Sequence, residues 1–237
     1  LREHIDQLGY RSNFVIYDTQ DQQSVIKGIM EDHDLEDSGL IDAKGVHYEI
    51  GQAKNRGLGP DHFLQQRDST RSTQVGQVFA EYQRVLKGCN AIDFDDILLL
   101  TLKLFEEHFE AMEPIRERYH YLMVDEYQDT NRVQYQLMCH LCQRHHNLCV
   151  VGDDDQSIYG WRGADIRNIL DFERDFPEAK IIRLEQNYRS TPTILKAANQ
   201  VISQNPQRMP KELWSQKPTG VLLEWIEGKN ESEELEL

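Results

Sequence analysis

Two adjacent carboxylates, Asp125 and Glu126, follow the short apolar run 121–124, and Asp153 follows a second apolar run at 148–151. Runs this short, bounded by polar residues, are typical of buried parallel strands. Because ligands bind at the carboxyl ends of such strands, we expect the three acids at one edge of a sheet. One carboxylate of the pair could hold a hard cation such as Mg²⁺. The other could orient or deprotonate a water that attacks a phosphoryl group.

The adjacent acids also have a purely structural interpretation. On a strand, neighbouring side chains point to opposite faces, so the two carboxylates could not share one role. Acids at a strand end that leads into a helix are favoured by the helix dipole in any case. The pair by itself leaves both interpretations open, and the surrounding sequence must decide between them.

Three longer segments resemble the motifs of one enzyme family. Residues 125–131, Asp-Glu-Tyr-Gln-Asp-Thr-Asn, resemble the Walker B motif (motif II) of superfamily 1A helicases. Residues 152–164, which end in Tyr-Gly-Trp-Arg-Gly-Ala, resemble motif III, and residues 184–190, Leu-Glu-Gln-Asn-Tyr-Arg-Ser, resemble motif IV. Nearly the whole chain is similar in character to the UvrD/Rep/PcrA group. The AddA/RecB helicase-nucleases share the first segment, but their motif III usually lacks the ending seen here.

The resemblance implies an α/β fold in which a RecA-like parallel sheet with flanking helices, part of a P-loop NTPase motor domain, carries a large all-helical insertion. Residues 1–17 and 115–191 would belong to the first motor domain (1A), and residues 18–114 to the helical insertion (1B). Residues 192–237 would begin the second motor domain (2A). The smaller motif at 92–97 would lead from the insertion back into the motor core, although Asp93 or Asp95 there is also an ordinary N-cap for the helix that follows.

The implied activity is that of a cytoplasmic, ATP-dependent DNA helicase. It would move 3′ to 5′ along single-stranded DNA and unwind duplex DNA by hydrolysing ATP. Its cofactors would be ATP and Mg²⁺, and its partners single-stranded DNA and junctions of single- and double-stranded DNA. A binding or interaction module that has lost catalysis is the alternative from a different class.

The resemblance also implies roles for single residues of the nucleotide site. Asp125 would coordinate Mg²⁺ and Glu126 would be the general base. Gln128 would belong to the nucleotide-binding residues, and Gln156 would sense the terminal phosphate or the attacking water. An amide in the position of Gln156 could instead only stabilise its loop.

Five further residues carry the remaining implied roles. Tyr188 would stack on adenine, and Arg189 would be an arginine finger that stabilises charge on the transferring phosphoryl group. Tyr159, Trp161 and Arg162 would form a platform for single-stranded DNA, because every base offers a π-face for stacking. Aromatic residues two positions apart could also be core packing, and the arginine could only cap a helix.

The elements that position these residues follow from hydrophobic periodicity and caps. Asn131 with Gln134 three residues later is a capping-box start, and Thr191 before Pro192 predicts another helix start. A helix after Asp165 should stop before Pro177. Residues 1–9 are predicted to be the end of a helix, with Ile5 and Leu8 pointing inward. The other predicted helices cover 20–31, 40–55, 60–67, 71–88, 93–109, 131–144 and 191–205. The predicted strands cover 14–17, 120–125, 147–151, 180–184 and 221–226.

Composition constrains the binding partners. The net charge of −15 has the wrong sign for a generic nucleic-acid binder. The acidic residues are unevenly distributed, however, since residues 31–42 carry six acids and no Lys or Arg. Residues 161–218 hold ten Lys and Arg against seven acids, a balance of +3. We therefore expect any DNA contact on that segment and on nearby loops.

The cysteine pair Cys139 and Cys142, with histidines nearby, suggests a zinc site only weakly. The segment has helical periodicity, and no second cysteine pair completes a tetrahedral set of ligands. Helix positions are the better interpretation. No apolar run approaches the ~18 residues of a membrane span.

The sequence contains no Gly-x-x-x-x-Gly-Lys-Ser/Thr string, whose amides and lysine hold the β- and γ-phosphates in a P-loop motor. The most similar string, at 228–230, lacks the upstream glycine and the hydroxyl. Residue 1 is Leu rather than Met. We therefore expect the chain to be an internal fragment of a helicase, and expect the fragment alone to be inactive.

Overall fold

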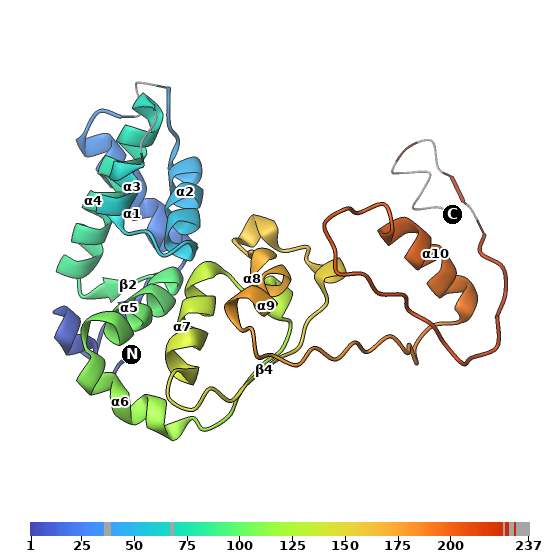
Figure 1. Cartoon of the computed structure of the whole chain (residues 1–237). Helices are drawn as coiled ribbons and strands as arrows, with labels where there is room; N and C mark the ends of the chain where they lie inside the picture. The colour runs from blue at the N-terminus through green and yellow to red at the C-terminus, as the bar shows by residue number, and fades with distance from the viewer. Residues whose placement is uncertain (36–38, 67–68, 225, 228–229, 231–237) are drawn as a thin grey trace. The chain divides into compact units, whose positions relative to one another are not determined.

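The structure is a computed structural model that describes residues 1–35, 39–66, 69–224, 226–227 and 230. It is a mixed α/β structure with many helices and two small parallel sheets among the described residues (Figure 1). The chain forms two compact units, Leu1–Ile169 and Leu170–Leu237. None of the described helices is both long and apolar enough to cross a membrane.

Four helices near the start of the chain share one hydrophobic core. They are α1 (Thr19–Asp32), α2 (Ala43–Asn55), α3 (Pro60–Gln65) and α4 (Thr70–Gly88), and Figure 1 shows them grouped together. Asp18 and Asp21 form a capping box that starts α1, and Ser69 and Ser72 do the same for α4. The buried residues of this core are Ile26, Ile29, Met30, Ile41, Val46, Ile50, Ala53, Val75, Val78, Phe79, Tyr82 and Leu86.

A second core lies between the N-terminal turn and two later helices. The turn Ile5–Leu8 (η1) is a 3₁₀ helix whose Ile5 and Leu8 are buried, as predicted. It packs with α5 (Phe94–Glu107) and α6 (Phe109–Arg118). Strands β1 (Val15–Ile16) and β2 (Ala91–Ile92) pair in parallel beside them.

Helix α6 lies beyond the predicted helices, of which the one at 93–109 ends where α6 begins. Pro114 lies inside α6, where it removes one intrahelical donor. Arg116 fixes the helix instead: its buried guanidinium donates hydrogen bonds to the carbonyl oxygens of Phe105 and Phe109 and lies over both rings. These contacts join α6 to α5.

The region of the three acids is a strand–helix–strand unit, as predicted. Strand β3 (Leu122–Val124) leads through a loop to α7 (Arg132–Cys142) and then to β4 (Leu148–Val150). The two strands pair in parallel, with Leu122 opposite Leu148 and Val124 opposite Val150. Both strands therefore end at the same edge, where their loops meet.

Three sequence predictions beyond β4 are wrong. Residues 180–184 form no strand; Ile182 and Leu184 are 68% and 81% exposed, and an extended run needs a neighbouring strand for its hydrogen bonds. Residues 221–224 and 226 likewise form no strand, and Trp225 lies outside the described residues. The helix expected after Asp165 is two short helices, α8 (Arg167–Leu170) and α9 (Phe172–Asp175).

Besides the short helix α9, the described part of the second unit contains a longer helix and a parallel bridge. Helix α10 (Pro192–Ile202) starts as predicted, with Thr191 as N-cap and Pro192 in the first turn, and ends before the expected residue 205. The Thr191 side chain makes no cap hydrogen bond. An isolated parallel bridge joins Gln186 to Trp214.

Candidate functional site

Asp125 and Glu126 lie in the loop just beyond β3, not on the strand itself. The argument that they point to opposite faces of a strand therefore does not apply. Glu126 adopts the left-handed conformation, with φ 49° and ψ 42°, which is uncommon for a residue with a side chain. Its backbone N–H donates to Oδ1 of Asp125 at 2.9 Å. Both side chains are exposed, so both carboxylates are accessible to a ligand.

Gln128 joins the loop after β3 to the loop after β4. Its Nε2 donates to Oε2 of Glu126 at 2.8 Å, and its Oε1 accepts from the backbone N–H of Asp153 at 2.9 Å. The residue is only 1% exposed. Its amide thus hydrogen-bonds a residue of each loop, and the nucleotide-binding role implied for Gln128 stays a prediction.

Gly152 allows this junction to form. A Cβ at this position would lie 2.8 Å from Oε1 of Gln128 and 3.2 Å from the backbone nitrogen of Tyr127. Backbone pairing also continues past the strands, since the N–H of Tyr127 donates to the carbonyl of Val151. The glycine thus lets the two loops approach to backbone contact.

Gln156 enters the same network through Asp153. Its Nε2 donates to Oδ2 of Asp153 at 2.7 Å, and Oδ1 of Asp153 accepts from the backbone N–H of Asp155. Gln156 is exposed on a 3₁₀ turn, η4 (Asp154–Gln156). The three acids expected at one sheet edge, Asp125, Glu126 and Asp153, therefore lie in the two loops that Gln128 joins, and Gln156 is linked to them through Asp153.

The residues expected to bind DNA lie at the short 3₁₀ turn η5 (Gly160–Arg162), with Tyr159 just before it and Trp161 and Arg162 within it. Trp161 is 61% exposed and Tyr159 is 37% exposed, which argues against the alternative that they are core packing. Their ring centroids are 6.4 Å apart at an interplanar angle of 50°. The guanidinium of Arg162 lies 5.0 Å from the Tyr159 centroid and 4.6 Å from the Trp161 centroid. The three side chains form one cationic aromatic cluster.

Tyr188 and Arg189 belong to the second compact unit and are both exposed. Oδ1 of Asn187 accepts from the backbone N–H groups of Arg189 and Ser190 and shapes the turn that leads to α10. The Tyr188 hydroxyl donates to Oε1 of Gln186. Both side chains therefore stand on a turn that the side-chain oxygen of Asn187 fixes through two backbone N–H groups.

Family models account for most of the chain. The model of the UvrD/REP helicase N-terminal domain matches residues 1–177, and the model of the UvrD-like helicase C-terminal domain matches residues 182–237. The chain belongs to the UvrD/REP helicase family.

Curated relatives of this UvrD/REP-family chain agree with that assignment. It is 48% identical over 231 residues to the ATP-dependent DNA helicase PcrA of Bacillus subtilis strain 168, covering 98% of this chain and 31% of the relative. It is 45% identical over 236 residues to the ATP-dependent DNA helicases PcrA of Staphylococcus epidermidis RP62A and Staphylococcus aureus NCTC 8325, covering 100% of this chain and 32% of each relative. The chain thus spans about a third of the length of these relatives.

Sequence reasoning about this UvrD/REP-family chain missed a buried ion cluster. Nζ of Lys54 lies 2.5 Å from Asp93 and 2.8 Å from Asp96, and all three side chains are at most 2% exposed. The Tyr82 hydroxyl donates to Asp93 at 2.9 Å. Asp93 is the N-cap of α5, as predicted for Asp93 or Asp95, but nothing in the local sequence indicates its lysine partner.

The cluster shifts the pKa values of its members. Burial lowers the pKa of Lys54, but Asp96 and Asp93 outweigh it and raise that pKa above its usual value. Burial works against ionisation of Asp93, yet Lys54 holds its pKa below the usual range. The pKa of Asp95, on the same turn, is raised to about 6, mainly by burial and then by Asp93.

The cysteines of the weak zinc hypothesis lie on α7, as the helical interpretation predicted. Cys142 is buried, and its Sγ donates to the carbonyl of Cys139 within the helix. Among the described residues, the acids that lie close enough to hold a cation together are Asp153, Asp154 and Asp155. Asp154 in this group is 5% exposed.

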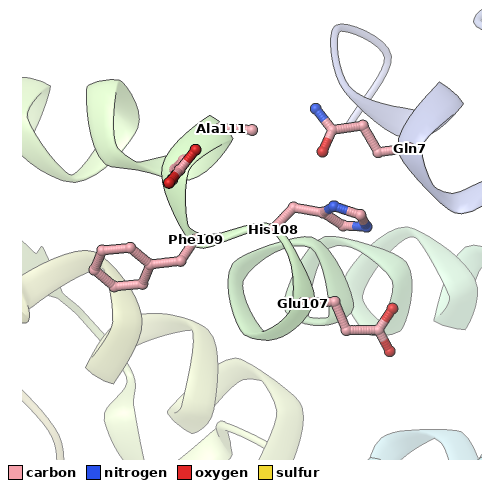
Figure 2. Close-up of a pocket in the computed structure, with 6 residues that line it drawn as sticks. Gln7, Glu107, His108, Phe109 and Ala111 are labelled. Atoms are coloured by element: carbon pink, nitrogen blue, oxygen red, sulfur yellow. The ribbon is translucent and has the colours of Figure 1, made fainter.

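A hollow of about 470 Å³ lies elsewhere, at the corner between α5 and α6. Figure 2 shows Gln7 from η1 facing this corner, with His108 between the two helices. None of the residues that line it is a predicted site residue: Gln7, Glu107, His108, Phe109, Glu110 and Ala111. The hollow is separate from the candidate site.

Proposed function

We propose that the intact protein containing this chain is an ATP-dependent DNA helicase that moves 3′ to 5′ along single-stranded DNA and unwinds duplex DNA. One observation carries the proposal: Glu126, Gln128, Asp153 and Gln156 form a continuous hydrogen-bonded network that joins the loops after β3 and β4. The carboxylates stay exposed at the sheet edge where α/β proteins bind ligands. This arrangement suits hydrolysis of a nucleoside triphosphate.

The donor set at this edge fits Mg²⁺ and a nucleotide. Asp125 offers oxygen ligands at an exposed position, which suits a cation that keeps several of its waters. The metal, when bound, would neutralise charge on the phosphates. Glu126 would accept the proton of the attacking water, with its carboxylate held by the Gln128 amide. Gln156 would orient the same water or the terminal phosphate.

The remaining site residues would act in the intact enzyme. Tyr188 would stack on adenine, and Arg189 would stabilise the charge that develops on the transferring phosphoryl group. Tyr159, Trp161 and Arg162 would bind single-stranded DNA, because their exposed rings can stack on bases and the guanidinium adds positive charge. Junctions of single- and double-stranded DNA are the proposed substrates.

Family membership also supports a domain assignment. In this proposal, residues 1–17 and 115–191 form part of a RecA-like motor domain, residues 18–114 form its helical insertion, and residues 192–237 begin a second motor domain. The helical group α1–α4 and the parallel pair β3–β4 support that division.

The isolated chain is proposed to be inactive, since its sequence lacks the P-loop string that supplies most of the phosphate binding. Its net charge of −15 also opposes binding to a polyanion, so any DNA binding should be weak and salt-sensitive. Turnover is measured with Mg²⁺, ATP and oligo-dT. Hydrolysis by the isolated chain that is lost in Glu126→Gln would contradict this part of the proposal.

Two substitutions in the intact enzyme test the activity itself. Glu126→Gln should bind ATP but lose turnover, because the base is gone while the shape of the site remains. Asp125→Ala should raise the Mg²⁺ concentration needed for nucleotide binding. Binding is followed with a fluorescent ATP analogue and turnover by phosphate release. Near-normal turnover in Glu126→Gln would remove the proposed base.

A further inference from the structure

Asn55, the last residue of α2, touches both loops that carry the proposed chemistry. Its Oδ1 accepts a hydrogen bond of 2.6 Å from Nδ2 of Asn131. Asn131 is the N-cap of α7, at the end of the segment that begins with Asp125 and Glu126. The connection therefore reaches the carboxylate loop (residues 125–131) from outside the strand–helix–strand unit.

The other side of Asn55 lies against the aromatic loop (residues 157–165). A Cβ added to Gly163 would come within 3.0 Å of Cβ of Asn55, and Gly163 has a φ of +91°. One turn earlier on α2, Nε2 of Gln52 donates to the carbonyl of Trp161 at 3.1 Å. The last turn of α2 therefore holds the backbone on which Trp161 stands.

The end of α2 is itself fixed. Lys54, the neighbour of Asn55, is fully buried and ion-paired to Asp93 and Asp96 at the start of α5. Nδ2 of Asn55 donates to the carbonyl of Gly51 in its own helix. An asparagine suits this position because its amide oxygen accepts from Asn131 while its amide nitrogen donates within α2.

The two loops also contact each other directly. The backbone N–H of Asp165 donates to the carbonyl of Thr130 at 3.0 Å, and Nδ2 of Asn168 donates to the same carbonyl at 3.0 Å. Asn55, Asn131, Thr130 and Asp165 thus belong to one packed junction. Because such packing is not freely compressible, displacement of one loop must be passed to the other.

We propose that Asn55 is a positioning residue that couples the aromatic loop to the carboxylate loop, so that single-stranded DNA bound at Trp161 accelerates ATP turnover at Glu126. This inference rests on the proposed function. Asn55 would touch neither nucleotide nor DNA. Its substitution should therefore uncouple the two sites without removing either of them.

The first test uses the intact enzyme and the ratio of ATPase rates with and without saturating oligo-dT. Asn55→Ala should lower this ratio roughly fivefold, the size expected from one lost hydrogen bond, while the rate without DNA stays within about twofold. Lys44→Ala, an exposed position on the first turn of the same helix, is the control and should leave the ratio unchanged. An unchanged ratio in Asn55→Ala, or an equal fall of both rates together with the melting temperature, would overturn the proposal.

Failure of the proposed function gives a different result: the unsubstituted enzyme would then show no DNA-stimulated hydrolysis at all. A second measurement on this chain needs no activity. Hydrogen exchange at the amide of Asp165 should become faster in Asn55→Ala but not in Lys44→Ala, because that amide lies in the packed junction. An unchanged exchange rate of the Asp165 amide in Asn55→Ala would contradict the proposed role of Asn55 in the packed junction.

Asn131→Ser keeps the experiment decisive if Asn55→Ala does not fold. Serine can still cap α7 but lacks the amide that donates to Asn55. The variant should lower the ATPase ratio and speed exchange at Asp165 in the same direction. The double variant Asn55→Ala/Asn131→Ser should lower the ATPase ratio little further than either single variant, because both substitutions remove the same hydrogen bond. Additive losses would show that Asn55 and Asn131 act separately and would contradict the proposal.

Discussion

Nε2 of Gln128 lies 2.8 Å from Oε2 of Glu126, and the other end of the same buried amide accepts from the backbone N–H of Asp153. One side chain thus sets the distance between the proposed base and the loop after β4. A hydrogen bond to a charged group contributes about 1.5–3 kcal/mol, more than a neutral one. Loss of the hydrogen bond from Gln128 to Glu126 should therefore lower kcat measurably.

Gln128→Met, a substitution of similar size, should reduce kcat of the intact enzyme roughly 10- to 100-fold, because Glu126 loses the donor that orients it. Steady-state ATPase kinetics measure the effect. Gln143→Met, an exposed position at the end of α7, is the matched control and should leave kcat unchanged. A folded Gln128→Met enzyme with kcat within twofold of the unsubstituted enzyme would rule out the orienting role.

Trp161→Ala in the intact enzyme should weaken binding of single-stranded DNA by ~1–3 kcal/mol, or roughly 5- to 150-fold in Kd, because an exposed ring that stacks on a base is lost. Trp161→Phe should retain most of the affinity. Ile158→Ala, 69% exposed in the same loop but without a π-face, is the control. Fluorescence anisotropy of labelled oligo-dT at fixed salt gives Kd. Equal losses in Trp161→Ala and Ile158→Ala would argue against stacking.

Asp95 should make the stability of this chain depend on pH. Its folded pKa of about 6 lies above the usual 3.8, so the folded state binds the proton more tightly than the unfolded state. The stability that this group contributes is therefore full below pH 3.8 and is lost as the pH rises through about 6. Asp95→Asn cannot ionise and should be more stable than the unsubstituted chain at pH 7.5, by up to about 3 kcal/mol.

That difference should shrink towards zero at pH 4, where Asp95 in the unsubstituted chain is protonated. Urea unfolding at both pH values measures it. Asp32→Asn, at the exposed end of α1, controls for the loss of one negative charge. A gain in Asp95→Asn that is the same at pH 4 and pH 7.5 would show that ionisation is not its cause.

Gly152→Ala should destabilise this chain by ~1–3 kcal/mol, because the new methyl group would overlap Oε1 of Gln128 and crowd the backbone of Tyr127. Gly28→Ala on α1 makes the same chemical change where no atom lies within 4 Å, and should stabilise the chain by about 0.5–1 kcal/mol. Urea unfolding compares the two variants. The two substitutions should change the free energy of unfolding in opposite directions. An unchanged free energy of unfolding in Gly152→Ala would mean that the two loops can separate without cost.

Local patterns in the sequence were sufficient to predict a helix or strand wherever residues close to it in the chain stabilise it. Helices α1, α2 and α4 follow from apolar residues at helical spacing, and the Asn131–Gln134 capping box starts α7 where predicted. The runs before Asp125 and Asp153 are strands that pair in parallel. The candidate site residues next to those strands were proposed from motif and spacing alone, and their roles stay predictions.

Local signals misled where an element depends on partners distant in the chain. The apolar runs at 180–184 and 221–226 resemble strands, but a strand needs a neighbour for its backbone hydrogen bonds, and periodicity does not report one. Helix α6 forms in spite of Pro114, because Arg116 is held by Phe105 and Phe109. In each case, whether the segment forms a helix or a strand depends on a partner residue or strand that lies outside the local pattern.

The sequence by itself determined the family, the main helices, the two strands and the identity of the candidate chemical groups, because short-range patterns encode all of these. Only the tertiary structure decided how the groups are connected. Asn55 meets Asn131 across 76 residues of chain, and Lys54 meets Asp93 across 39. Such contacts arise when separate helices bury their apolar faces together, so the packing of whole elements, rather than any local pattern, selects which polar side chains meet.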